Sequence, residues 1–199
     1  GVNIADELAQ LGWTNTLVLE KGPLSLPGGS TSHAPGVVFA TNGSKSMTQF
    51  AIYTIDKFSG LKNSEGQASF NHVGGLEVAT TPERLAELHR RAGWTASRGH
   101  EGHVVDAAEA KRLYPLIDES VVLGAYYTPR DGIALAVQAN QLLIERTRAV
   151  GVEYRDDTTV VGIDHANGKV TGVFVNDGER IPADIVVSAA GFWGPAIGE

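Results

Sequence analysis

A short loop of small residues around one imidazole is the part of this chain whose residue types could do chemistry. The loop covers residues 28–36, written GGSTSHAPG, and His33 is its only reactive side chain. It follows an apolar run at 16–19 that ends on Glu20. Glycines and small hydroxyl residues let the backbone approach a large flat ligand without side-chain collisions. A buried strand that ends on an acid, followed by such a loop, predicts a nucleotide cofactor site.

The elements before this loop fit half of a βαβ unit. An amphipathic pattern predicts a helix over 2–11, and the next apolar run predicts a strand over 16–20. We interpret Gly1 as the third glycine of a GxGxxG turn, so the preceding strand is expected outside the sequence and both ends are interpreted as cut. Glu20 then lies roughly 20 residues after that turn, where such folds place an acid on the adenosine ribose. A solvated acid at a strand end explains Glu20 equally well.

In the rest of the sequence, the spacing of apolar residues predicts both helices and strands. We expect helices over 46–57, 81–91, 106–113 and 136–150, with the second ending near Gly93. We expect strands over 73–79, 121–127, 152–154, 158–163, 170–175 and 184–189. Asn167-Gly168 is a hairpin-turn signal between two of them. Arg130 and Asp131 fall in a turn, where a local salt bridge accounts for both.

This order predicts an α/β fold in which a Rossmann-like sheet is interrupted by an α+β insertion. The nucleotide-binding domain would occupy 1–40 and 133–199, and the insertion, part of a substrate domain, would occupy 41–132. A sheet domain with a second domain inserted in it is typical of large flavoenzymes. Simple NAD-dependent dehydrogenases generally have a continuous nucleotide domain, so they are disfavoured.

Composition excludes several classes of protein. The net charge of −7 is scattered along the sequence, which disfavours nucleic acid and membrane surfaces as partners. No apolar run is long enough to cross a membrane. The absence of cysteine excludes disulfides and thiol chemistry and fits a cytoplasmic location. The histidines show no metal-ligand spacing, so we expect no metal site.

Several stretches carry a resemblance to a known family. TLVLEKGPLSLPGGSTSHAPG contains a loop of the form G-[ST]-[ST]-x-H-x-x-G, and FNHVGGLEVATTPERLAELHRRAGW, EAKRLYPLI, GVEYRDDTTVVGI and IPADIVVSAAGFWG agree further along. The chain resembles the dimethylglycine oxidase and dimethylglycine–sarcosine dehydrogenase family of FAD-dependent oxidoreductases over its whole length. That resemblance implies FAD joined covalently through its 8α-methyl carbon to His33. Without it, we would interpret His33 as a loop histidine that hydrogen-bonds a phosphate or a carbonyl.

The resemblance also implies roles for residues around the loop. Ser30, Thr31 and Ser32 would offer backbone and hydroxyl donors to the pyrophosphate and the flavin ring. An ordinary glycine–serine turn is the alternative for these three residues.

Four further positions are candidates for cofactor binding. Lys21 would flank the adenosine beside Glu20, and Val160 would touch adenine through main-chain atoms. Val37 would pack its backbone against the flavin. The turn at Gly191 would pass near the cofactor. A surface lysine and two core valines are the structural alternatives for the first three. We give the neighbouring Trp193 a packing role.

The implied function is oxidative demethylation of dimethylglycine or sarcosine by hydride transfer to FAD. Oxygen or an electron carrier would reoxidise the flavin, and a folate-binding part of the family's longer chains would capture the one-carbon unit. Substrate-side catalytic residues are expected beyond residue 199, so none is assigned here and the fragment alone is expected to be inactive. The alternatives are a non-covalent FAD amino-acid oxidase such as a glycine oxidase, and a catalytically inert nucleotide-binding remnant.

Overall fold

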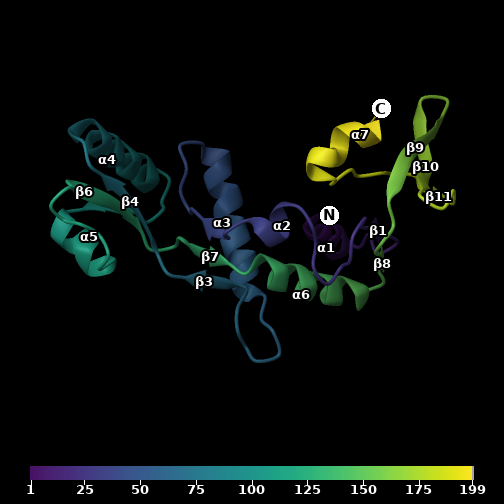
Figure 1. Ribbon diagram of the computed structural model, residues 1–199, viewed down its shortest axis with the longest axis horizontal. Coiled ribbons are helices and arrows are strands. Elements are labelled where there is room, and N and C mark those ends of the chain that lie inside the picture. Colours follow the sequence, from purple (N-terminus) through teal and green to yellow (C-terminus); the bar gives the residue numbers. More distant parts are fainter. Residues whose placement is uncertain (199) are drawn as a thin grey trace. The chain divides into compact units, whose positions relative to one another are not determined.

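The computed structural model describes residues 1–198 of the chain. The chain divides into two compact units: unit 1 comprises Gly1–Ala34 with Ala136–Glu199, and unit 2 comprises Pro35–Leu135. The elements of both units are labelled in Figure 1. Within the described residues, no helix has the length and apolar character needed to cross a bilayer.

In unit 1, two helices lie beside a short parallel strand pair. α1 (Val2–Gln10) packs against α6 (Ala136–Arg148), and β1 (Leu17–Leu19) pairs in parallel with β8 (Glu153–Arg155). This arrangement confirms the helix at the N-terminus and both strands. An ion pair joins the helices, because Arg146 donates to both carboxylate oxygens of the buried Asp6 at 2.6 Å.

A three-stranded antiparallel sheet follows in unit 1. β9 (Val160–Ala166), β10 (Lys169–Val175) and β11 (Arg180–Pro182) lie in the order β11-β10-β9. Asn167 and Gly168 both have positive φ values, of 50° and 74°, as a type I′ hairpin turn requires. The expected hairpin is therefore confirmed, while β11 was not anticipated.

The expected strand over 184–189 does not form. These residues run irregularly to a short 3₁₀ turn, η1 (Gly191–Trp193), and to α7 (Gly194–Gly198). Ile185 and Val187 are 61% and 56% exposed. A strand needs a partner for its backbone hydrogen bonds, and no strand among residues 1–198 pairs with this stretch.

One part of unit 2, built from both ends of its chain, is a small sheet covered by a helix. β2 (Val37–Val38), β7 (Gly132–Ala134) and β3 (Phe70–His72) form a sheet in the order β2-β7-β3. α3 (Lys45–Gly60) begins at a Ser44 cap and contacts β3. Its Ile55 packs with Ala40 and Phe70 in a buried apolar cluster.

The middle of unit 2 contains a second sheet that is also covered by helices. β4 (Gly75–Ala79), β6 (Gly124–Thr128) and β5 (His103–Val105) form an antiparallel sheet in the order β4-β6-β5. α4 (Pro82–Ser97) packs on this sheet, and α5 (Ala107–Leu113) contacts β6. The apolar cluster here contains Ala79, Leu88 and Tyr126.

Two expectations in unit 2 need correction. α4 continues through Gly93 to Ser97, because a glycine weakens a helix by roughly 1 kcal/mol without ending it, and the buried Thr95 hydroxyl bonds Tyr126 Oη at 2.7 Å in the next turn. The strand expected over 73–79 begins only at Gly75, since Gly74 has a φ of +73° that interrupts extended backbone. β3 lies before that interruption and was missed.

Candidate cofactor site

The loop that carries His33 contains one helical turn. α2 (Ser30–His33) begins after Gly29, whose φ of 66° and ψ of −149° suit glycine. His33 Nδ1 lies 2.7 Å from the carbonyl oxygen of Gly29 and 3.0 Å from Ser32 Oγ. A carbonyl oxygen can only accept, so Nδ1 is the donor in this contact, and in the neutral ring the lone pair lies on Nε2. The ring is exposed, and Nε2 has no hydrogen-bond partner among residues 1–198.

Glu20 lies at the end of β1, close to the start of α1. Its backbone bonds Arg155 and Thr158 at 2.9 Å, and its Oε1 accepts a hydrogen bond from the Gly22 N–H at 3.1 Å. The Glu20 carboxylate lies near Gly1, the residue that precedes α1. An acid therefore stands beside a helix N-terminus, the arrangement in which nucleotide folds bind a ribose and a pyrophosphate.

Lys21 and the segment after Gly191 approach the same loop. The Lys21 ammonium lies 5.8 Å from the centroid of the Trp193 ring, and Phe192 stacks on that ring at 3.9 Å. A Cβ added to Gly29 would lie 3.6 Å from Trp193. Within unit 1, the structure thus brings Lys21, Gly29 and the turn that starts at Gly191 together.

The two candidate valines lie in different units. Val160 is half-buried at the start of β9, opposite Val175 of β10. Val37 is 49% exposed in β2, which belongs to unit 2.

The residues present fit a flavin nucleotide. A Cβ on Gly28 would meet nothing within 4 Å, which leaves open space at the start of the loop. Gly36, at the loop's end, has a φ of +78°, and a Cβ there would lie 2.3 Å from the carbonyl oxygen of Ala134. Only glycine fits such a position. Together with the acid of Glu20 and an exposed imidazole, the loop supplies groups suited to each part of the nucleotide.

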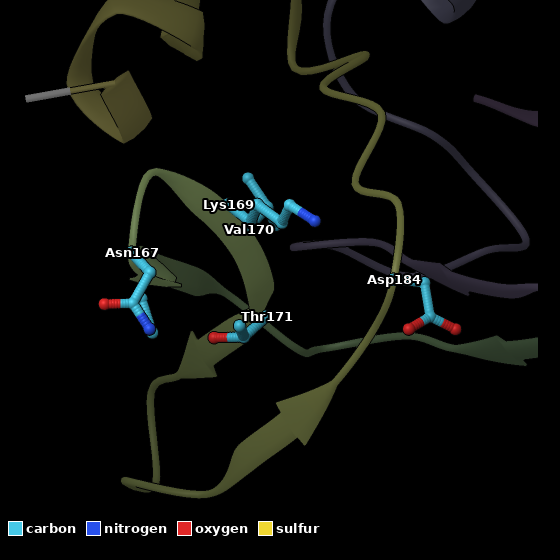
Figure 2. A pocket seen from close by; sticks show the side chains of 6 residues that line it. Asn167, Lys169, Val170, Thr171 and Asp184 are labelled. Atoms are coloured by element: carbon cyan, nitrogen blue, oxygen red, sulfur yellow. The ribbon is translucent and has the colours of Figure 1, made fainter.

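The structure also shows an open hollow of about 660 Å³ on the β9–β10 hairpin. Figure 2 shows Asn167, Lys169, Thr171 and Asp184 around it. None of the residues expected to bind the cofactor lines it. We therefore do not assign the cofactor to this hollow.

The expectation for the 130–131 turn is wrong. Arg130 pairs with Asp56 of α3, not with Asp131. Asp131 is only 5% exposed, and its Oδ1 accepts a hydrogen bond from the Ala40 N–H at 2.6 Å. Burial raises the pKa of this carboxyl to about 6, and the Ala40 bond opposes that rise. The only feature of the sequence that could have indicated this role of Asp131 was its position directly before a glycine in a turn.

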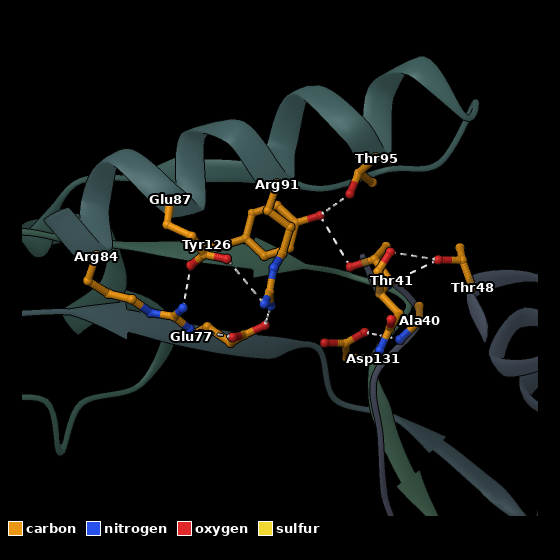
Figure 3. Close-up of polar contacts among 11 residues, drawn as sticks. Ala40, Thr41, Thr48, Glu77, Arg84, Glu87, Arg91, Thr95, Tyr126 and Asp131 are labelled. Atoms are coloured by element: carbon orange, nitrogen blue, oxygen red, sulfur yellow. Dashed lines mark hydrogen bonds and ion pairs between the residues drawn. The ribbon is translucent and has the colours of Figure 1, made fainter. Parts of the chain in front are cut away.

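The polar groups around Asp131 and Tyr126 form a second cluster that the sequence did not reveal (Figure 3). The buried Tyr126 hydroxyl bonds Thr95 at 2.7 Å and Thr41 at 3.3 Å. Beside it, Glu77 of β4 is paired with Arg84 and Arg91 of α4.

The comparisons with known proteins cover the whole chain. The family model described as DAO, FAD dependent oxidoreductase, matches residues 1–199. The 4-methylaminobutanoate oxidase (formaldehyde-forming) of Paenarthrobacter nicotinovorans is 31% identical over 97% of this chain and 23% of its own. Human mitochondrial dimethylglycine dehydrogenase is 27% identical over 100% of this chain and 23% of its own.

Two further matches bear on fold and function. The mouse mitochondrial pyruvate dehydrogenase phosphatase regulatory subunit is 27% identical over 100% of this chain and 22% of its own. The L-proline dehydrogenase of P. horikoshii superposes with a TM-score of 0.88 at 26% identity, covering 98% of this chain and 51% of its own. The chain therefore spans less than a quarter of the length of these three curated relatives and about half of this solved structure.

Proposed function

The chain belongs to the DAO family of FAD-dependent oxidoreductases, and from this we propose that it is the FAD-binding part of an amine oxidoreductase with covalently bound flavin. His33 would hold the flavin through its 8α-methyl carbon. The substrate would be an N-methylated glycine, dimethylglycine or sarcosine. FAD, when bound, supplies the acceptor for the hydride that leaves the N-methyl carbon.

The state of the His33 ring carries this proposal. A histidine attacks carbon only through an unprotonated nitrogen, so a covalent bond needs one ring nitrogen with a free lone pair. The Gly29 carbonyl accepts from Nδ1, so in the neutral ring the lone pair lies on Nε2, which has no protein partner in residues 1–198, and His33 is exposed. The loop 28–36 also contains no lysine or cysteine that could compete with this nitrogen.

The other candidate residues would bind and orient the nucleotide. Glu20 would accept hydrogen bonds from the adenosine ribose, while the amides and hydroxyls at 30–32 would donate to the pyrophosphate and the flavin ring. Lys21, held near Trp193, would flank the adenosine. Backbone atoms of Val160 and Gly191 would supply further contacts within unit 1, and the role expected for Val37, which belongs to unit 2, stays a prediction.

We assign FAD binding to unit 1 and part of the substrate domain to unit 2. The names of two relatives, a dimethylglycine dehydrogenase and a formaldehyde-forming methylaminobutanoate oxidase, support a substrate with an N-methyl group. The full protein would pass electrons to oxygen or to an electron carrier, would deliver the one-carbon unit to folate bound elsewhere in the chain, and would act in the cytoplasm. The 199 residues alone would not turn over substrate.

The test uses the full-length protein, denatured in acid and separated on a denaturing gel. Flavin fluorescence should stay on the protein band of the wild type, stay in His165→Ala and disappear in His33→Ala. His165 is an exposed histidine of the same unit, so it controls for the loss of an imidazole. Fluorescence that persists in His33→Ala would assign the link to another residue.

Two other outcomes would favour different functions. Flavin that leaves the protein on denaturation would indicate a non-covalent amino-acid oxidase, a possibility that the glycine oxidase of Geobacillus kaustophilus supports by fold alone, with a TM-score of 0.82. Bound flavin that is reduced by none of dimethylglycine, sarcosine and 4-methylaminobutanoate would favour a non-enzymatic role. One of the relatives is named as a phosphatase regulatory subunit, and this name supports the non-enzymatic alternative.

A further inference from the structure

The glycine whose carbonyl contacts the His33 ring has little local structure to hold it. Gly29 precedes α2, which is a single turn of four residues and has no side-chain cap. An isolated turn of this length is unstable in water, because forming it fixes several backbone angles for one hydrogen bond. Gly29 also adopts a φ of 66° and a ψ of −149°, a region essentially confined to glycine, the residue with the greatest backbone freedom. The direction of the Gly29 carbonyl therefore depends on groups outside the loop.

The loop is attached to α6 on both sides of its glycine pair. Gln141 of α6 donates a hydrogen bond to the Ser25 carbonyl oxygen at 3.1 Å, and α2 contacts the same helix. All of these elements belong to unit 1. Between the two contacts, Gly28 and Gly29 remain the part of the loop with the most backbone freedom.

A tryptophan ring lies against the second of these glycines. A Cβ built on Gly29 would lie 3.6 Å from Cζ3 and 4.0 Å from Cη2 of Trp193, which is ordinary van der Waals contact. Within residues 1–198, no other group beyond the adjacent residues comes within 4 Å of that position. A Cβ built on Gly28 would meet nothing within 4 Å. The Trp193 ring therefore limits the movement of the Gly29 backbone on this side.

The Trp193 ring is itself held in unit 1. Phe192 stacks on it with a centroid distance of 3.9 Å, and the Lys21 ammonium lies over it, 5.8 Å from its centroid, where a cation is attracted to an indole. The Trp193 N–H donates to the Ala190 carbonyl oxygen at 3.1 Å, and α7, which follows directly, contacts β9. These contacts position the ring although Trp193 is 45% exposed.

We propose that Trp193 is a positioning residue that decides which ring nitrogen of His33 joins the flavin. The Trp193 ring keeps the Gly29 carbonyl directed at Nδ1, so the neutral ring of His33 carries its lone pair on Nε2. This inference rests on the proposed function, because it concerns the covalent attachment of FAD. Trp193 acts through Gly29 and does not touch the reacting atoms.

The attachment step is an oxidation that molecular oxygen completes. The bond from a His33 ring nitrogen to carbon replaces one C–H bond of the 8α-methyl group. The proton of that C–H bond and the N–H proton of the ring leave, and the two electrons pass through the flavin to molecular oxygen, which becomes hydrogen peroxide. Only the nitrogen with the lone pair forms the new bond, so the tautomer of His33 before attachment decides the product.

The test determines the position of the link in full-length protein purified with its flavin. Proteolytic peptides that contain His33 are compared with Nδ1-linked and Nε2-linked histidyl-flavin standards. Trp193→Ala frees Gly29, so Nδ1-linked flavin should rise about fivefold relative to Nε2-linked flavin, the factor expected when one neutral hydrogen bond is lost. Trp193→Phe keeps a six-membered aromatic ring at this position, and its ratio of the two products should stay close to that of wild type.

Trp13→Ala is the matched control. Trp13 is 55% exposed in the same unit, so this variant also removes a partly exposed indole, but from the connection between α1 and β1. Its link should be that of wild type. The wild-type ratio in Trp193→Ala would overturn the proposal even if less flavin were bound, since a purely structural role changes the amount and not the position of the link. The same shift in Trp13→Ala or in Trp193→Phe would also overturn it.

Failure of the proposed function gives a different result. If wild-type protein holds flavin without a covalent bond, the attachment proposal fails, and the tautomer of His33 becomes the readout. Nitrogen NMR spectra of the histidine-labelled protein at alkaline pH report it, and the signals missing in His33→Ala identify this ring. Protonated Nδ1 in wild type and Trp193→Phe, with a shift toward protonated Nε2 in Trp193→Ala, would support the positioning role. The same tautomer in all three proteins would contradict it.

Discussion

The proton on the His33 ring is fixed by its own loop: Nδ1 lies 2.7 Å from the Gly29 carbonyl oxygen four residues earlier. Only Nε2 is then available as a nucleophile, so we predict that the flavin is linked to Nε2. A proteolytic peptide containing His33 should release a histidyl-flavin that matches the Nε2 standard in NMR and chromatography. A match to the Nδ1 standard would mean that the Gly29 contact breaks before the bond forms.

Gly36→Ala should disrupt the end of the cofactor loop. A Cβ at this position combines a φ of +78° with a separation of 2.3 Å from the Ala134 carbonyl oxygen. The strained backbone alone costs about 1–2 kcal/mol, and the overlap adds to that cost, so we expect a loss of roughly 3 kcal/mol with much less covalent flavin. Urea unfolding and the flavin-to-protein ratio of the full-length protein measure the two effects.

Gly66→Ala is the matched control. Gly66 has a φ of +82° in the same unit, but a Cβ there would meet nothing within 4 Å. The Gly66→Ala variant should lose about 1–2 kcal/mol of unfolding free energy, and its flavin content should be unchanged. Equal losses in the two variants would show that contact with Ala134 contributes nothing.

Arg146→Met should destabilise unit 1 strongly. Asp6 is 1% exposed and accepts hydrogen bonds from Nε and Nη2 of Arg146, so the variant removes these charge-assisted bonds from a buried carboxylate. The Arg146 side chain is 47% exposed, so we expect the cost of a hydrogen bond to a charged group, about 1.5–3 kcal/mol. Arg155→Met, which breaks the exposed pair with Glu179, should cost less than about 1 kcal/mol. Similar melting temperatures for both variants would contradict the prediction.

The stability of unit 2 should depend on pH through Asp131. Its pKa is about 6 in the folded protein against 3.8 as the ordinary value, so folding favours the protonated form. The stability that the protonated Asp131 carboxyl gives to the folded protein is fully present below pH 3.8 and is lost as the pH rises through 6. With 1.36 kcal/mol per pKa unit, Asp131→Asn should gain about 3 kcal/mol relative to wild type between pH 3.5 and pH 7.5.

Urea unfolding of both proteins across this range measures that difference. Asp118→Asn is the control, because the Ser120 bonds lower the pKa of Asp118, which makes its pH dependence opposite in sign. A constant difference between wild type and Asp131→Asn at all pH values would show that the folded carboxyl titrates normally.

The sequence predicted the family, the α/β class and most elements whose signal is local. The family resemblance is confirmed by the match over residues 1–199. The hairpin at Asn167-Gly168 could be predicted because positive φ at two adjacent residues is a property of those residues themselves. The short strands β2, β3, β5, β7 and β11 could not, since two or three residues carry no period and depend on a distant partner.

The same distinction applies to the site. The loop around His33 could be predicted because its residues are contiguous in the sequence. The tautomer of the His33 ring could not, because it depends on a contact with the backbone of Gly29 that no sequence pattern encodes. Asp131 was misinterpreted because its partner, the Ala40 N–H, lies 91 positions away in the chain. The roles given to Glu20, Lys21, Val37, Val160 and Gly191 stay predictions.

The contact between Gly36 and Ala134 includes a hydrogen bond from the Ala134 N–H to the Gly36 carbonyl oxygen at 2.8 Å, which has a consequence for folding. The two residues lie close to the first and last residues of unit 2, while Leu17 and Glu153 of unit 1 can pair only across the whole intervening chain. Once unit 2 has folded, its joined ends replace a long flexible loop by a short connection, which reduces the entropy lost when β1 meets β8. We therefore expect the contiguous unit to form first during synthesis, with the split unit completed only after its second half emerges.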